Sequence, residues 1–159
     1  MNLRRITVSA LAALGLLLVG CSTSAQQART AQELEVREAI VGYQIASWDL
    51  RADVYFLEIE SKNPQQDFLD RFKDIPRLVK GENASKMKKD VAGYHIEDRR
   101  TKKRGVLFDQ GPMVWKDDST IDVADGYDCA TLCAGSGIYH LKQFDGRWKV
   151  QRFEIRLMS

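Results

Sequence analysis

Cys129 and Cys133, in the stretch GYDCATLC, are the side chains of this 159-residue sequence best suited to chemistry. Two thiols at this spacing can form a disulfide, act as a redox pair, supply half of a zinc site, or stay free. A thioredoxin-type redox motif has two residues between its cysteines, whereas three intervene here. A zinc site needs two further ligands, and the sequence offers two histidines, His95 and His140. The residue types therefore favour a disulfide or free thiols over the redox and zinc alternatives.

His140 is the best candidate for acid–base chemistry. It lies in an alternating run in which Ile138, His140 and Phe144 share one face of a predicted strand. Paired with Asp125, or with Asp122, it could accept and donate protons. The alternative is an ordinary hydrogen-bonded or solvent-facing histidine, which is the commoner case, and the same holds for His95. We therefore name His140 and Asp125 as candidate catalytic residues, and we expect no cofactor and no metal.

A basic run stands between two predicted strands. It contains Arg99, Arg100, Lys102, Lys103 and Arg104. Such a cluster could contact anionic lipid, lipopolysaccharide or an acidic partner. A solvated hairpin turn is the alternative, and we favour it.

The N-terminus has the features of an export signal. Arg4 and Arg5 precede an apolar run of about 15 residues, shorter than the roughly 20 needed to span a bilayer. A charged start, a short apolar run and small residues at its end are typical of a secretory signal peptide. We predict a signal peptide over residues 1–20.

The end of this signal resembles a bacterial lipobox, in the sequence Leu18-Val19-Gly20-Cys21. The resemblance implies cleavage before Cys21, diacylglycerol on its sulfur, and a further acyl chain, such as palmitate, on the new amine. Two or more acyl chains anchor a protein stably in a membrane. Ser22 is not the acidic residue that retains some lipoproteins in the inner membrane. We therefore expect a lipoprotein of the cell envelope, anchored in the outer membrane and facing the periplasm.

Removal of the signal changes the charge balance. The whole chain has 24 Lys and Arg against 22 Asp and Glu, and residues 1–20 hold two arginines and no acid. Residues 21–159 therefore carry a formal net charge of zero. A neutral chain gives no argument for nucleic-acid binding. The partners we expect are the membrane, through Cys21, and an envelope protein or a small apolar ligand.

An exported protein usually meets an oxidising compartment, which bears on the cysteine pair. Lipidation would consume Cys21 and leave Cys129 and Cys133 as an even pair. In a straight strand their Cα atoms would be about 13 Å apart, whereas a disulfide needs about 4.4–6.8 Å. The sequence thus predicts a disulfide if the chain turns between them.

The remaining elements indicate an α+β protein. Residues 21–31 are small and polar and suit a tether, and residues 32–159 are long enough for one domain. A helix is predicted over residues 30–47, where Thr30 and Glu33 form a capping-box pattern. Val36, Ile40 and Tyr43 recur at helical spacing within it and mark its apolar face. A strand is predicted over 53–60, a short helix over 64–72, and a loop over 74–90.

The C-terminal half is predicted to be a meander of strands. The candidates are residues 91–97, 105–109, 113–115, 120–126, 138–144 and 148–157. Asp145-Gly146 is a hairpin signal between the last two. Trp148 and Val150 are out of phase with Phe153, so we predict a bulge near Gln151–Arg152. Helices followed by a meander favour helices packed on one face of a sheet.

Residues 126–150 resemble a group of bacterial lipoproteins and secreted proteins of unknown function. Their pattern is Gly-Tyr-Tyr-Cys-x-x-Leu-Cys, a glycine-rich turn, Tyr-x-Leu, and Gly-x-Trp-x-Val; Asp128 replaces the second tyrosine. The matching residues are Gly126, Tyr127, Cys129, Leu132, Cys133, Gly135, Gly137, Tyr139, Leu141, Gly146, Trp148 and Val150. The group resembles the nuclear-transport-factor-two-like superfamily. That likeness implies a cone-shaped fold, with helices packed on a curved antiparallel sheet, and no activity.

Two functions follow as expectations. The first is a non-catalytic binding or assembly module anchored in the membrane. The second is a small hydrolase- or isomerase-like enzyme that uses a pocket in the cone. The sequence lacks a dense set of His, Asp and Glu at catalytic spacing, so we favour the first.

Overall fold

The structure is a computed structural model, and it describes residues 12–47, 52–130 and 133–158. The chain divides into two compact units, Met1–Leu34 and Glu35–Ser159. The second unit combines helix and sheet, so the α+β prediction is confirmed.

The first helix is much longer than predicted. Helix α1 runs without interruption over Ala12–Ser47 instead of beginning at residue 30. Thr30 is not a cap, because its hydroxyl donates a hydrogen bond to the carbonyl of Gln26, 3.0 Å away inside the helix. The predicted tether is rich in Ala, Gln and Arg, which favour helix, and the few Ser and Thr residues do not stop it. The polar composition of residues 21–31 was therefore a poor guide to their conformation.

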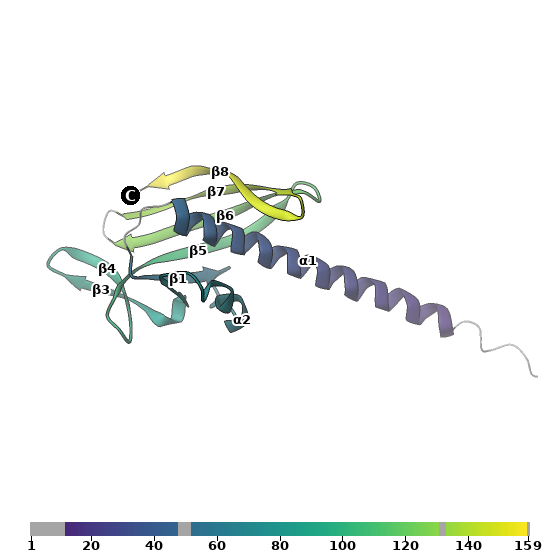
Figure 1. Cartoon of the computed structure of the whole chain (residues 1–159), viewed down its shortest axis with the longest axis horizontal. Coiled ribbons are helices and arrows are strands. Elements are labelled where there is room, and N and C mark those ends of the chain that lie inside the picture. The colour runs from purple at the N-terminus through teal and green to yellow at the C-terminus, as the bar shows by residue number, and fades with distance from the viewer. Residues whose placement is uncertain (1–11, 48–51, 131–132, 159) are drawn as a thin grey trace, which may run out of the picture. The chain divides into compact units, whose positions relative to one another are not determined.

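Eight strands form one sheet in the order β2-β1-β5-β4-β6-β7-β8, and β3 pairs with β4 (Figure 1). The strands are β1 Val54–Ile59, β2 Leu78–Gly81, β3 Ser85–Asp90, β4 Gly93–Asp98, β5 Arg104–Trp115, β6 Thr120–Ala130, β7 Cys133–Phe144 and β8 Arg147–Met158. Between β1 and β3 lie the short helices α2 Gln66–Leu69, η1 Asp70–Phe72 and η2 Glu82–Ala84. The predicted strand at 53–60 and the short helix at 64–72 are thus confirmed.

The sheet is mixed, so the prediction of an antiparallel sheet is wrong for one edge. Strand β1 runs parallel to both β2 and β5. A parallel pair requires a crossover connection rather than a hairpin. The segment from Glu60 to Arg77, which contains α2 and η1, provides that crossover between β1 and β2.

The prediction of a loop over residues 74–90 is also wrong, because this segment contains strands β2 and β3. Strand β3 pairs with β4 along its whole length, from Ser85 opposite Asp98 to Asp90 opposite Gly93. Three of its six residues are lysines, a composition typical of loops and of exposed edge strands alike. The strand forms because β4 supplies its hydrogen-bonding partner.

The part of helix α1 that belongs to the second unit, from Glu35 on, covers one face of the sheet, here called the inner face. Val36 and Ile40 of the helix pack with buried side chains of β6, β7 and β8. The strand members of this core are Ile121, Val123, Tyr139, Leu141 and Trp148. Two aromatic pairs contribute to this core. The rings of Tyr139 and Phe153 stack with their centroids 4.4 Å apart, and the ring of Trp115 packs edge to face against that of Trp148. The helical spacing in the sequence identified this apolar face correctly.

The opposite face, here called the outer face, has a smaller core at one side. Val54, Phe56 and Ile96 are buried together, with Ala84 and Leu107 packed against them. The rest of the outer face, over β5–β8, carries mostly polar and small side chains, with a few exposed hydrophobic residues such as Leu157. The sheet therefore buries apolar surface on both faces and leaves part of the outer face open.

The last hairpin agrees with the sequence analysis. Asp145 and Gly146 both have positive φ, 50° and 73°, as the predicted turn between β7 and β8 requires. His140 pairs with Arg152 and Leu141 with Val150, so Gln151 is the extra residue of a bulge. This confirms the predicted bulge, which brings Val150 and Phe153 into the same core.

Candidate functional site

A shallow groove on the outer face is the main concave feature. It consists of two hollows of about 450 Å³ and 380 Å³ that share Asp109, Gly126 and Ser136 in their linings. The larger one falls within the usual size range of small-molecule sites. Its other lining residues are Glu58, Leu107, Tyr127, Asp128, Ala134, Gly135, Leu157 and Met158.

The groove exists because its floor has little side-chain bulk. Gly126, Ala134 and Ser136 stand on the adjoining strands β6 and β7, and Ala124 and Gly111 continue the floor into the smaller hollow. Larger side chains rise at the rim. Among them Leu157 and Met158 are exposed large hydrophobic residues near the end of β8.

The larger hollow of the groove is acidic, whereas Arg156 is among the residues that line the smaller one. The larger hollow is lined by three carboxylates, those of Glu58, Asp109 and Asp128. Burial and the negative charges of Asp109 and Glu82 raise the pKa of Glu58. The neighbouring negative charges disfavour the ionised form of Glu58, so a positively charged group in the groove would relieve the repulsion.

His140 lies on the outer face beyond the groove and joins three strands. Its Nδ1 is 2.7 Å from Oδ1 of Asp122 on β6, and its Nε2 is 3.3 Å from Oε2 of Glu154 on β8. Lys116 pairs with the same aspartate at 3.2 Å, and Arg156 pairs with the same glutamate at 2.7 Å. Both ring nitrogens are therefore engaged by carboxylates. Of the two partners, Asp122 was foreseen as an option and Glu154 was missed, because a strand register is needed to find it.

Asp125 does not contact His140, whereas Asp122, the alternative partner named from the sequence, does. Asp122 is opposite His140, whereas Asp125 is opposite Gly137. Gly137 and His140 are three positions apart, and because side chains alternate between faces along a strand, these two positions face opposite sides. Asp125 consequently lies on the inner face, buried beneath α1.

Asp125 is instead part of a buried polar contact. Its Oδ1 accepts a hydrogen bond of 2.8 Å from Nε2 of Gln44 on α1. Its Oδ2 has no hydrogen-bond partner within the described chain. Burial raises the pKa of Asp125 well above its usual value, and the charge of Asp109 adds to this, against the hydrogen bond from Gln44 and the charge of Arg37. Burial also raises the pKa of the nearby Tyr139.

The second histidine, His95, belongs to the β3–β4 pair. Its Nδ1 is 3.2 Å from Asp90, and its Nε2 is 3.5 Å from Glu97. Burial acts to raise the pKa of Glu97, but hydrogen bonds from Lys86 and His95 and the charge of Lys88 lower it overall. These contacts assign His95 to a local ion cluster.

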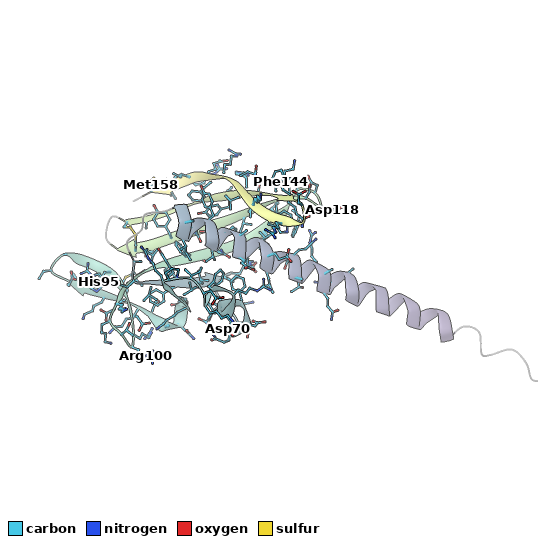
Figure 2. All side chains as sticks on the ribbon, viewed as in Figure 1. Asp70, His95, Arg100, Asp118, Phe144 and Met158 are labelled. Carbon is cyan, nitrogen blue, oxygen red and sulfur yellow. A yellow bond between two sulfur atoms is a disulfide. The ribbon has the colours of Figure 1, made fainter. Side chains whose placement is uncertain are left out.

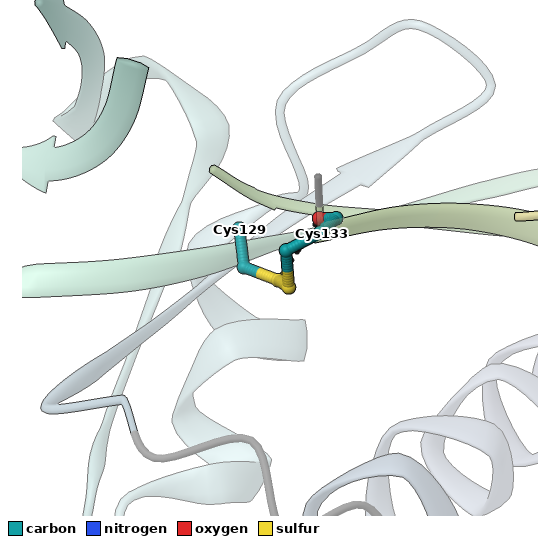
Figure 3. Close-up of a disulfide and its surroundings, with 2 residues drawn as sticks. All are labelled: Cys129 and Cys133. Carbon is teal, nitrogen blue, oxygen red and sulfur yellow. Dashed lines mark hydrogen bonds between the residues drawn. A yellow bond between two sulfur atoms is a disulfide. The ribbon is translucent and has the colours of Figure 1, made fainter. Parts of the chain in front are cut away.

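The two cysteines meet at the end of the β6–β7 hairpin. Their Cα atoms are 5.4 Å apart, and the structure joins Cys129 to Cys133 as a disulfide (Figure 3). The register between β6 and β7 shifts between Asp128 and Ala130, which brings the chain round for the bond. Leu132 of the sequence motif lies outside the described residues.

We expect the Cys129→Ser and Cys133→Ser double variant to fold and to lose about 2 kcal/mol of stability. The closed loop is short, so its effect on the entropy of the unfolded chain is modest. Urea unfolding of both proteins measures the difference, and peptide mapping without reductant should find the two cysteines in one linked fragment. Free thiols at both positions in protein isolated without reductant would contradict the bond.

The basic run forms an ordered turn between β4 and β5. Asp98 accepts hydrogen bonds from the backbone N–H groups of Arg100 and Thr101 and pairs with Lys80. Burial acts to raise the pKa of Asp98, but the contacts with Lys80 and Thr101 hold it well below the usual value. The side chains of Arg99 to Arg104 are exposed, as expected for a solvated turn.

Cys21 lies within α1, and its side chain is outside the described part. No described helix is both long enough and apolar enough to cross a bilayer. Within residues 12–47, 52–130 and 133–158, no group of three or more His, Cys, Asp or Glu side chains is arranged to hold a metal ion.

Comparison with known proteins returned no match. No protein-family model, curated protein or solved structure is significantly similar to this chain.

Proposed function

We propose that this chain is the precursor of a bacterial envelope lipoprotein whose C-terminal unit is a non-catalytic binding module. The Leu-Val-Gly-Cys junction at residues 18–21 supports the anchor, and the groove on the outer face supports the binding role. The anchor would hold the protein in the outer membrane, facing the periplasm.

The observation that carries the binding role is the composition of the groove. Leu107, Leu157 and Met158 offer apolar surface, and Glu58 and Asp109 offer negative charge beside it. This combination suits a small ligand with an apolar body and one positive charge. An acid–base enzyme has less support, because both nitrogens of His140 are engaged and Asp125 lies on the other face of the sheet.

We also propose that the unit is a variant of the cone-shaped superfamily. The helix followed by an antiparallel meander of β5–β8 supports this relationship. The parallel pairing of β1 departs from the expected sheet. A solved structure of the protein in which β5–β8 curl around α1 would support the relationship, and a flat sheet would oppose it.

The anchor is tested by intact mass of the protein extracted from membranes. The mass should exceed that of residues 21–159 by at least a diacylglycerol group, and Cys21→Ala should move the protein to the soluble fraction. Recovery of unmodified wild-type protein in the soluble fraction would refute lipidation. It would not bear on the binding role proposed for the groove.

The groove is tested with dodecylamine as the probe and dodecanol as its uncharged counterpart. We expect saturable binding of the amine, with Asp109→Asn weakening it by about tenfold because a charge-assisted contact is lost. Ser136→Trp should block the floor, and Thr120→Trp, on the same face but outside the groove, is the matched control. Equal binding of amine and alcohol, or equal effects of both tryptophans, would refute the site.

A further inference from the structure

The β3–β4 hairpin stands apart from the rest of the sheet. Strand β3 pairs with β4 alone, and β4 contacts the other strands only from His95 onward. Figure 1 shows the hairpin extending away from the other strands, and in Figure 2 its labelled His95 lies well apart from Asp118 and Phe144. We call the segment from Met87 to Tyr94 the hairpin tip.

The hairpin tip exposes apolar side chains. Met87 is 62% exposed, Tyr94 is 49% exposed, and Val91 at the turn is fully exposed. Eight large hydrophobic side chains are exposed in the described chain, and three of them fall within these eight residues. Single exposed hydrophobic residues are ordinary on a protein surface, but a group of them on a projecting element indicates a contact surface.

The same region is strongly basic. Between Ser85 and Arg104 the chain has eight basic and three acidic side chains, in a protein whose residues 21–159 are neutral overall. Excess positive charge is therefore concentrated in the β3–β4 hairpin and the turn that follows it, whereas the larger hollow of the groove on the outer face is acidic. Such segregation orients a protein toward a negatively charged surface.

The ion pairs within the chain show which of these basic side chains could contact an external partner. Lys86 and Lys88 lie 3.1 and 3.9 Å from the buried Glu97, and they help to fix the two strands together. Lys89 instead lies over the ring of Tyr94, with its Nζ 5.3 Å from the ring centroid. No ion pair is found for Lys89, Arg100 or Lys103 within the described part of the chain.

We propose that the hairpin tip docks onto an anionic lipid surface, with Val91 and Met87 entering the headgroup region and Lys89 and the basic turn contacting lipid phosphates. Basic residues near an anionic bilayer each contribute a favourable attraction, and exposed apolar side chains bind at the boundary between headgroups and acyl chains. Tyr94 is suited to that boundary because its ring is apolar and its hydroxyl is polar. The apolar tip favours lipid over nucleic acid, which offers a charged backbone without an apolar layer.

This contact is separate from the proposed lipid anchor. An anchor holds the chain at a membrane through Cys21, whereas the tip would fix which side of the unit Glu35–Ser159 meets the lipid. The two proposals can therefore fail independently.

The test places an environment-sensitive dye on the tip. The full chain with Cys21→Ser, which cannot be acylated, receives the dye at Val91→Cys and is reconstituted with vesicles of phosphatidylglycerol and phosphatidylethanolamine or of phosphatidylcholine alone. A matched protein carries the dye at Asp118→Cys, in the exposed turn between β5 and β6. We expect blue-shifted emission at position 91 with the anionic vesicles only, and no shift at position 118.

Charge variants complete the test. Lys89→Gln and Arg100→Gln should each weaken the response at position 91 about fivefold, as expected for one basic residue near an anionic surface. An unshifted dye at position 91 in both kinds of vesicle would overturn the proposal. Equal shifts at positions 91 and 118, or a shift produced by DNA and not by vesicles, would overturn it as well.

Discussion

Replacing Asp125 with asparagine is expected to stabilise the protein at neutral pH, by about 3 kcal/mol, the order of magnitude for an uncompensated buried charge. The carboxyl group is buried under α1, one oxygen accepts a hydrogen bond from Gln44, and the other has no partner within the described residues. Asparagine keeps an oxygen to accept the bond from Gln44 and carries no charge.

The pH dependence of this stability difference follows from the direction in which the pKa of Asp125 is shifted. Burial raises the pKa of Asp125 in the folded protein above its value in the unfolded chain. The protonated carboxyl group is therefore compatible with folding, and its contribution is fully present below the unfolded pKa of about 3.9. As the pH rises from there toward the folded pKa, the unfolded chain loses its proton first, and the wild type loses stability relative to Asp125→Asn by up to about 1.4 kcal/mol per pH unit.

Chemical denaturation of both proteins at several pH values from 5 to 8 measures this difference. Asp118→Asn is the control, because Asp118 is an exposed carboxylate in a turn. A constant difference between wild type and Asp125→Asn over the whole range would show that the folded pKa of Asp125 lies below it, and would contradict the large upward shift.

Replacing Gly137 with alanine is expected to cost about 3 kcal/mol or more, the upper range for an overpacked core. An added Cβ would lie 2.3 Å from the backbone oxygen of Glu154 and 2.7 Å from the ring of Phe153. The backbone oxygen belongs to β8, so relief requires the strand to move, and that would disturb the stacking of Phe153 on Tyr139.

Gly135→Ala is the matched comparison, since it is two residues away on the same face of β7. A Cβ there would meet the ring of Tyr127 at 2.6 Å, and its three nearest atoms all belong to that side chain. The Tyr127 side chain can rotate, so we expect a smaller loss of stability than for Gly137→Ala. Thermal and urea unfolding of the two variants should rank them in this order, and the reverse ranking would contradict the packing described for β7 and β8.

These two glycines also explain part of the sequence motif. Gly135 and Gly137 lie beneath aromatic rings from neighbouring strands, an arrangement that compensates for the missing side chain of a glycine in a sheet. The sequence predicted a glycine-rich turn after Cys133, but both residues lie within strand β7. A glycine between strands can thus serve packing rather than chain reversal, and composition alone does not distinguish the two.

Local signals in the sequence were sufficient for several elements. Val54–Ile59 is rich in β-branched and aromatic residues, Asp145-Gly146 adopts the positive φ angles of a tight hairpin, and the break in alternation after Val150 marked the bulge at Gln151. Each depends on the conformational preference of a few neighbouring residues. The apolar spacing of Val36 and Ile40 likewise identified the face of α1 that packs on the sheet.

Other features depend on contacts between distant segments. Lysine-rich β3 is a strand because β4 pairs with it, and β1 runs parallel to β2 because the chain crosses over through α2 and η1. The register of β6 against β7 places His140 beside Asp122 and sends Asp125 to the other face, since a shift of one residue in register would exchange the faces. Strands such as β1 and β8 could therefore be predicted from their own residues, but β3 and the side chains that meet across the sheet were set by pairing and register, which no single segment encodes.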